Sequence, residues 1–221
     1  MVAEFEQRES LPERIDRRWL YDESCRPPCW EGLVAGETPL WDAMAILEAN
    51  PEILDYGVTD NHYIMYWEAP SLLGNAVLSN DESGRIEEIS IEILGAEMVV
   101  SDVTNLLGDP HYVVPVIVTG IDTAWVGVFF YLVYPKMGFA LSGEWVKREP
   151  GSRGFDSRYV TALYYSRSGS TLDDYLATVN GGPLSVRRRY IPFEPNKSFY
   201  DYCIEAYGPS SELGQLCPQL P

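Results

Sequence analysis

The sequence has few residues of positive charge and no long apolar run. Lysine occurs only at Lys136, Lys147 and Lys197, and the formal net charge is −17 with an isoelectric point near 4.4. Because nucleic-acid phosphates and anionic lipids require a basic protein surface, this charge excludes nucleic acid and anionic membranes as expected partners. The longest apolar runs, 113–118 and 126–134, are the length of strands, so we expect no transmembrane segment.

Motifs that mark common catalytic sites are also missing. The chain contains no Gly-x-Ser-x-Gly elbow, no glycine loop for phosphate and no His-Glu-x-x-His zinc motif. Its two histidines, His62 and His111, have no nucleophile and orienting acid near them in the sequence, so both are expected to be structural. We therefore predict no catalytic residue, no cofactor and no metal site.

A secreted carbohydrate-active or other hydrolase that uses two carboxylates stays open as an alternative, because acidic residues are plentiful. The distance between two such carboxylates depends on the fold and not on their spacing along the chain. The sequence offers candidates without a means of choosing a pair among them: Asp60, Glu68, Asp122 and Asp156.

Cysteine is absent between two pairs that lie near opposite ends of the chain. Cys25 and Cys29 form the first pair, and Cys203 and Cys217 form the second. The spacing of the first pair occurs in some zinc sites, but the wide spacing of the second pair does not complete one. An even number of cysteines without a metal-binding pattern predicts two disulfides, and hence an extracytoplasmic protein that is secreted or held at the cell surface.

The pairing of these cysteines stays open, because four cysteines allow three connectivities. Bridges between the two ends of the chain would each contribute about 4 kcal/mol or more, against roughly 3 kcal/mol for a short loop. The first 18 residues are too polar for a signal peptide. We therefore expect that an export signal or a lipid anchor was removed upstream, with residues 1–22 as a polar tether.

The order of apolar patterns predicts an α+β fold with a repeated unit. In each unit a short helix is followed by an antiparallel sheet, and the disulfides staple the fold. We predict a first module over residues 23–94, a second over 95–166, and a helical and strand segment over 167–221 that closes the fold.

Two helix starts carry capping residues and amphipathic spacing. In the first, Thr38 is the expected N-cap, and the side facing the core contains Leu40, Ala43, Met44 and Leu47. In the second, Ser101 is the expected N-cap and Gly108 the stop, and the inward residues are Val103, Leu106 and Leu107. Further helices are expected over 169–181 and 198–207.

Strands are predicted between these helices. Four isoleucines in one of them alternate imperfectly with polar residues, which indicates a sheet with one buried and one solvent-facing side: Ile86, Ile89, Ile91 and Ile93. Residues 80–84, just before this strand, have the composition of a hairpin turn. The expected strands cover residues 63–67, 76–79, 85–93, 112–118, 125–134, 139–146, 159–165 and 186–191.

Aromatic residues are concentrated on the predicted strands. Because successive side chains alternate between faces, about half of these residues are expected to lie outside the core. Exposed aromatic patches mark contact surfaces for proteins or sugars. The candidate contact surface consists of Trp125, Phe129, Tyr131, Tyr66 and Trp67. Trp30 and Trp41, near the first cysteine pair, are instead expected to fill the end of the core.

Two segments resemble known families. Residues 25–38, which read CRPPCWEGLVAGET, resemble the "PCW-x-GI-x-PG-x-T" opening of uncharacterised exported proteins and lipoproteins of Chloroflexi-type bacteria. That likeness implies export and no particular activity. Residues 98–110, MVVSDVTNLLGDP, are similar to the helix motif of small outer-membrane-assembly lipoproteins and of the β-lactamase-inhibitor-protein fold. This second resemblance implies helix-and-sheet modules that are used in tandem to grip another protein.

These observations predict an exported, acidic protein that works by binding rather than by catalysis. The expected partner is another protein, contacted through an exposed sheet face or edge, and pairing of edge strands between copies of the chain is one form of that contact. Besides the hydrolase, an inhibitor of a secreted enzyme is the other alternative.

Overall fold

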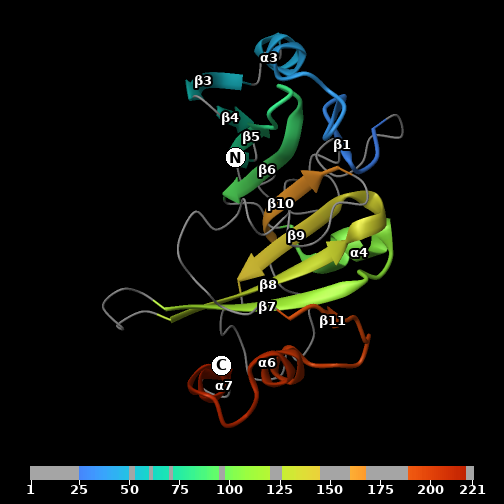
Figure 1. The fold of residues 1–221 in the computed structure, drawn as a ribbon, viewed down its shortest axis with the longest axis vertical. Helices are drawn as coiled ribbons and strands as arrows, with labels where there is room; N and C mark the ends of the chain where they lie inside the picture. The colour runs from blue at the N-terminus through green and yellow to red at the C-terminus, as the bar shows by residue number, and fades with distance from the viewer. Residues whose placement is uncertain are drawn as a thin grey trace, which may run out of the picture. The chain divides into compact units, whose positions relative to one another are not determined.

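The computed structural model describes residues 25–49, 53–59, 62–69, 72–94, 98–119, 126–144, 160–167 and 189–217. These residues form helices, antiparallel strands and two disulfides, which confirms the predicted α+β class (Figure 1). They separate into two compact units. Unit 1 takes its described residues from 1–98, 135–139 and 162–179, and unit 2 from 99–134, 140–161 and 180–221. The module boundaries drawn from the sequence stay a prediction.

Unit 1 contains antiparallel strands that we call the unit 1 sheet. Strands β3 (Ile53–Thr59), β4 (His62–Ala69), β5 (Leu72–Asn80) and β6 (Ile86–Leu94) are neighbours both along the chain and across the sheet. The part of β10 (Val160–Ser166) that belongs to this unit pairs with β6. A small hairpin of β1 (Cys29–Trp30) and β2 (Leu33–Val34), helix α3 (Leu40–Glu48) and the 3-10 turn η2 (Pro135–Met137) complete the unit. Strand β3 has no counterpart among the strands predicted from the sequence.

A β-bulge explains why the isoleucines of β6 alternate imperfectly. The pairing of β6 with β5 shifts by one residue at Glu87, which is therefore an extra residue in β6. This residue returns Ile86 to the face of the sheet that holds Ile89 and Ile91. All three isoleucine side chains are fully buried, so the bulge keeps the core of unit 1 continuous.

The predicted turn between β5 and β6 is confirmed. The Asp81 carboxylate accepts hydrogen bonds from the Ser83 N–H at 2.8 Å, the Ser83 hydroxyl at 2.6 Å and the Arg85 N–H at 3.1 Å. These bonds, above all the one from the Ser83 hydroxyl, hold the pKa of Asp81 below its usual value. Gly84 completes the turn with a φ of 76°, a conformation that favours glycine.

Helix α3 begins without the predicted cap. Pro39 occupies the N-cap position, and the Thr38 hydroxyl instead accepts a hydrogen bond from the Val34 N–H at 2.9 Å. The prediction that Thr38 caps this helix is therefore wrong. The Leu40 N–H donates to the Gly84 carbonyl at 2.9 Å, so the start of α3 is attached to the β5–β6 turn.

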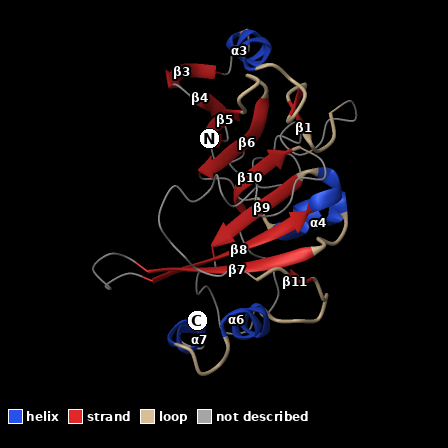
Figure 2. Cartoon of the chain, in the orientation of Figure 1, coloured by secondary structure: helices blue, strands red, loops and turns tan. Residues whose placement is uncertain are grey.

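Unit 2 contains the strands β11, β7, β8 and β9 in that order across the sheet. Their bounds are β7 (Tyr112–Thr119), β8 (Val126–Tyr134), β9 (Phe139–Glu144), of which Phe139 belongs to unit 1, and β11 (Ile191–Pro192). The helices are α4 (Val100–Leu107), α6 (Phe199–Tyr207) and α7 (Glu212–Leu216). Helices α6 and α7 lie side by side, and α6 lies next to β7 (Figures 1 and 2). The helix predicted over 169–181 lies outside the described residues.

Helix α4 departs from its prediction at its start and in one inward residue. Val99 is the N-cap, and its N–H donates to the Asp102 carboxylate at 2.9 Å. Ser101 lies inside the helix, so the prediction that Ser101 caps it is wrong. Leu106, predicted to point inward, is 38% exposed. Gly108 ends the helix with a φ of 81°, as predicted.

Helix α6 begins at the predicted position. The Ser198 hydroxyl accepts a hydrogen bond from the Asp201 N–H at 3.2 Å, and the Asp201 carboxylate accepts from the Ser198 N–H at 3.1 Å. This reciprocal pair is a capping box. The Asp201 carboxylate also accepts from the Ser198 hydroxyl at 2.6 Å, and that bond contributes most to lowering the pKa of Asp201. The Phe199 ring lies 6.2 Å from the ring of Phe130 in β8, so the start of α6 packs on the sheet.

Strand β11 pairs with β7 only at Tyr112 and Val113. The rest of this edge of β7 is blocked in two ways. Pro115 has no N–H to offer to a further strand. Tyr207 of α6 occupies the neighbouring backbone groups, because its hydroxyl accepts from the Ile117 N–H at 3.2 Å and donates to the Pro115 carbonyl at 3.0 Å. Another strand therefore cannot pair with β7 at these residues.

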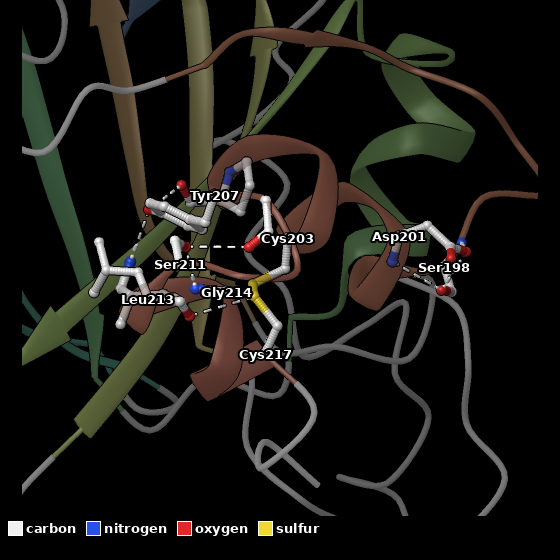
Figure 3. Close-up of a disulfide and its surroundings, with 11 residues drawn as sticks. Ser198, Asp201, Cys203, Tyr207, Ser211, Leu213, Gly214 and Cys217 are labelled. Carbon is white, nitrogen blue, oxygen red and sulfur yellow. Dashed lines mark hydrogen bonds between the residues drawn. A yellow bond between two sulfur atoms is a disulfide. The ribbon is translucent and has the colours of Figure 1, made fainter.

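Both disulfides close locally, which settles the pairing that the sequence left open. Cys25 joins Cys29 across four residues, and Cys203 joins Cys217 across 14. The second bridge ties α6 to the end of α7 (Figure 3). There a Cβ on Gly214 would lie 1.7 Å from the backbone oxygen of Gly208, so only glycine allows this close approach of α7.

Two tyrosine hydroxyls are buried where ionisation is unfavourable. Burial, together with the negative charge of Glu31, raises the pKa of Tyr165. Burial, together with the negative charge of Asp109, raises the pKa of Tyr134, whose hydroxyl donates to the Gly108 carbonyl at 3.0 Å. Both side chains therefore keep their protons in the folded chain at a pH where exposed tyrosines lose theirs.

We expect the protein to lose stability as the pH rises above about 10, the ordinary pKa of tyrosine. The unfolded chain then releases the protons of Tyr134 and Tyr165 while the folded chain retains them, which lowers the free energy of unfolding by up to about 1.4 kcal/mol per pH unit and residue. Urea denaturation across this range measures the loss. Tyr165→Phe should show a smaller loss than the wild type, and equal losses would contradict the assignment.

Candidate binding surface

The structure describes the side chains of two of the five predicted contact residues. Phe129 and Tyr131 lie two residues apart in β8, so they share a face, and both are half-buried. Tyr66 and Trp67 are successive residues of β4, and their side chains lie outside the described part of the structure. Trp125 lies outside the described residues. The surface of five residues therefore stays a prediction, of which the structure places Phe129 and Tyr131 together.

Helix α3 presents an apolar surface that was not predicted. Trp41 is 74% exposed and Ile46 is 46% exposed, and Ala45 is exposed between them in the sequence. We call these three residues the α3 outer side. Trp30 is buried, as expected, at 4% exposure, but the prediction that Trp41 fills the end of the core is wrong.

The amphipathic spacing of α3 contained the signal for this surface. The predicted inward stripe begins at Leu40 and ends at Leu47, and within it only Ala43 and Leu47 are fully buried. Successive helical residues are separated by about 100°, so Trp41 and Ala45 lie beside this stripe rather than in it. Figure 2 shows α3 near β3 in unit 1, and three residues, 50–52, separate the described parts of the two elements.

A row of polar residues crosses the unit 1 sheet on the face opposite Ile89 and Ile91. Each of its members pairs with the next across neighbouring strands, and paired residues share a face: Thr59, His62, Ser79, Glu88 and Ser166. Glu88 and Ser166 are each only 4% exposed, and the Ser166 hydroxyl has no hydrogen-bond partner. This part of the face is therefore polar and covered.

The same face is open further along β6. A second row runs parallel to the first, four residues further along β6. It consists of Asp55, Tyr66, Asn75, Glu92 and Ala162. Ser90, between the two rows, is half-buried, and Glu92 is exposed. Along β6, burial on this face thus decreases from Glu88 to Glu92, whereas on β10 the paired residues Ser166, Tyr164 and Ala162 all stay buried.

The two glutamates of these rows are too far apart for the carboxylate pair of a glycoside hydrolase. Glu88 and Glu92 are about 13 Å apart along β6, beyond the roughly 5 to 10 Å that separate the carboxylates of glycoside hydrolases. Of the acids considered from the sequence, Glu68 lies in β4, and three lie outside the described residues: Asp60, Asp122 and Asp156.

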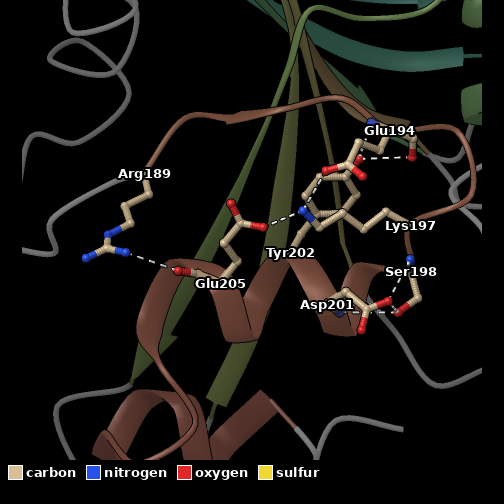
Figure 4. A network of polar contacts seen from close by, with 7 residues as sticks. All are labelled: Arg189, Glu194, Lys197, Ser198, Asp201, Tyr202 and Glu205. Carbon is tan, nitrogen blue, oxygen red and sulfur yellow. Dashed lines mark hydrogen bonds and ion pairs between the residues drawn. The ribbon is translucent and has the colours of Figure 1, made fainter.

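A cluster of charged residues in unit 2 neutralises itself (Figure 4). Lys197 donates to the Glu194 carboxylate at 3.0 Å, pairs with the Glu205 carboxylate and lies 4.8 Å from the centre of the Tyr202 ring. Burial alone would lower the pKa of Lys197, but the hydrogen bonds to Glu205 and Glu194 raise it overall. The Arg189 guanidinium donates to the Glu205 carbonyl at 3.2 Å. These contacts fasten the chain before α6 to the helix, which is a structural role.

Within the described residues, no three histidine, cysteine, aspartate or glutamate side chains are grouped as metal ligands. No helix in that part of the chain is long and apolar enough to cross a membrane. Comparison of the chain with protein-family models, with curated proteins and with solved structures found no match. The resemblances of residues 25–38 and 98–110 to known families therefore stay predictions.

We expect Glu88 and Glu92 to respond differently to the same substitution. Glu88→Ala removes a buried charged group together with its interactions, so the free energy of unfolding should fall by roughly 1–3 kcal/mol. Glu92→Ala changes an exposed side chain, so its effect should stay within about 0.5 kcal/mol. Urea denaturation of the two variants measures the contrast. Equal effects would show that the two ends of this face are equally covered.

Proposed function

We propose that the protein is an exported, non-catalytic binding module that contacts another protein through the α3 outer side. The observation that supports this proposal is Trp41, whose side chain is 74% exposed on a helix that buries only Ala43 and Leu47. Tryptophan is enriched among the residues that dominate binding energy at protein interfaces. Ala45, one turn along from Trp41, is exposed on the same side of the helix, whereas Ile46 lies about 140° round the helix from Trp41.

The charges around α3 indicate the chemistry of the partner. Asp42 and Glu48 are exposed on the same helix as Trp41, and the whole chain carries a net charge of −17. A basic partner surface is steered toward such a protein, whereas an acidic one is repelled. The partner we propose therefore has an apolar recess for the tryptophan and basic residues around it.

Export is supported by the two disulfides. Bridges of this kind persist in oxidising compartments and are rare where cellular thiols keep cysteines reduced. Phe129 and Tyr131, half-buried together in β8, stay a predicted second contact surface in unit 2. No observation on the described residues favours the hydrolase or the inhibitor over a binding module.

We expect Trp41→Ala to weaken partner binding by about 2 kcal/mol or more, which is roughly thirtyfold in affinity. The matched control is Tyr200→Ala, which removes a 46% exposed aromatic side chain from α6. Both variants and the wild type are immobilised and exposed to extracellular and envelope proteins of the native cells, and calorimetry with the purified partner gives the affinities. A partner bound equally by Trp41→Ala would place the contact elsewhere.

Export predicts that the cysteines are oxidised in the living cell. Intact cells are treated with a membrane-impermeant maleimide, with and without prior reduction by an impermeant phosphine, and the labelled cysteines are identified by mass spectrometry. Labelling of Cys203 and Cys217 only after reduction is expected, because both form a bridge. If the phosphine did not make these cysteines reactive in intact cells, and the maleimide labelled them only after lysis, the result would contradict export.

A further inference from the structure

Strand β3 is the last strand of the unit 1 sheet in the described part of the chain. The order of strands ends at β3, which pairs with β4 on one side. The outer side of an end strand presents unpaired N–H and C=O groups that can accept another strand. In unit 2 the exposed edge of β7 is blocked by Pro115 and Tyr207, and no equivalent contact covers β3 among the described residues.

We propose that β3 pairs with β3 of a second copy of the chain, antiparallel and about a two-fold axis at Gly57. The register of β3 against β4 is regular from Asp55 to Thr59, and the bulge lies before it, between Ile53 and Asp55. Because a bulge disturbs further pairing, the regular stretch is the part that can accept another strand. Gly57 is its middle residue, so the axis that pairs the whole stretch with itself passes there.

This register brings together compatible residues. It places Tyr56 opposite Val58 of the second copy, which is an aromatic and β-branched pair that stabilises sheets. Asp55 is the one charged residue of β3 and lies opposite Thr59, so no carboxylate faces another. At the axis, Gly57 is exposed and a Cβ added there would touch nothing within 4 Å. The face of the sheet at the axis is therefore open, and a side chain introduced at Gly57 meets no described atom of its own chain there.

The pairing also extends the buried face of unit 1. Val58 belongs to the cross-strand row that leads to Leu78, and Tyr56 belongs to the row that leads to Ile91. Leu78 and Ile91 are both fully buried. A self-paired β3 continues these rows of the register into the second copy. The proposal concerns β3 alone and does not rest on the function proposed for α3.

Sedimentation velocity of the full chain over a range of concentrations tests the pairing. The wild type should change from a monomer of 24.9 kDa to a dimer. Gly57→Asp and Gly57→Lys each place like charges opposite one another at the axis, so each should raise the dimer dissociation constant roughly tenfold or more. An equal mixture of the two variants should form a mixed dimer, because the introduced carboxylate then faces the introduced ammonium group.

The matched controls are Ser210→Asp and Ser210→Lys, which make the same charge changes at an exposed position of unit 2 and should leave the dimer unchanged. Circular dichroism establishes that all variants are folded. A wild type that stays monomeric would overturn the proposal, as would Gly57 variants that dimerise normally. A dimer that Gly57→Lys alone strengthens would also overturn it, since the axis would then not pass through Gly57.

Discussion

The register between β5 and β6 is the constraint on which the rest of unit 1 depends. It is held at one end by the Asp81 carboxylate, which accepts three hydrogen bonds within the turn. A slip of one residue would exchange the two faces of β6 and send Glu88 into the apolar core. The bulge at Glu87 belongs to the same register, because it lets the turn form while Ile86 remains buried. The pairing of β5 with β6 therefore determines both which residues form the polar rows and which form the apolar core.

The position of α3 follows from that turn. The Leu40 N–H donates to the Gly84 carbonyl, the Gly36 N–H donates to the Ile86 carbonyl, and the Ile86 N–H donates to the Thr38 carbonyl. These backbone contacts fix where the helix starts. With Ala43 and Leu47 turned inward, the helical period then leaves Trp41 outside. The exposure of Trp41 thus results from the way in which the backbone of α3 is attached to the β5–β6 turn.

Features that depend on neighbouring residues were predictable, and features that depend on tertiary partners were not. The start of α6 at residue 198 and the turn at Asp81 are local, and both were predicted from the sequence. Thr38 has the chemistry of a cap, but its hydroxyl is taken by Val34 of the β-hairpin. Strand β3 escaped prediction because Asp55 and Gly57, which disfavour strands, interrupt its apolar residues.

Charge and strand pairing act on this protein over different distances. The net charge of −17 repels other copies, but salt at physiological strength screens this repulsion beyond about 8 Å. Backbone pairing acts only at contact, where the residues directly opposite one another decide the outcome. In β3 the single carboxylate, Asp55, lies away from the centre of the regular stretch. An acidic chain of this kind is repelled by its copies at a distance, and in the proposed register at Gly57 the one carboxylate of β3 does not face its counterpart.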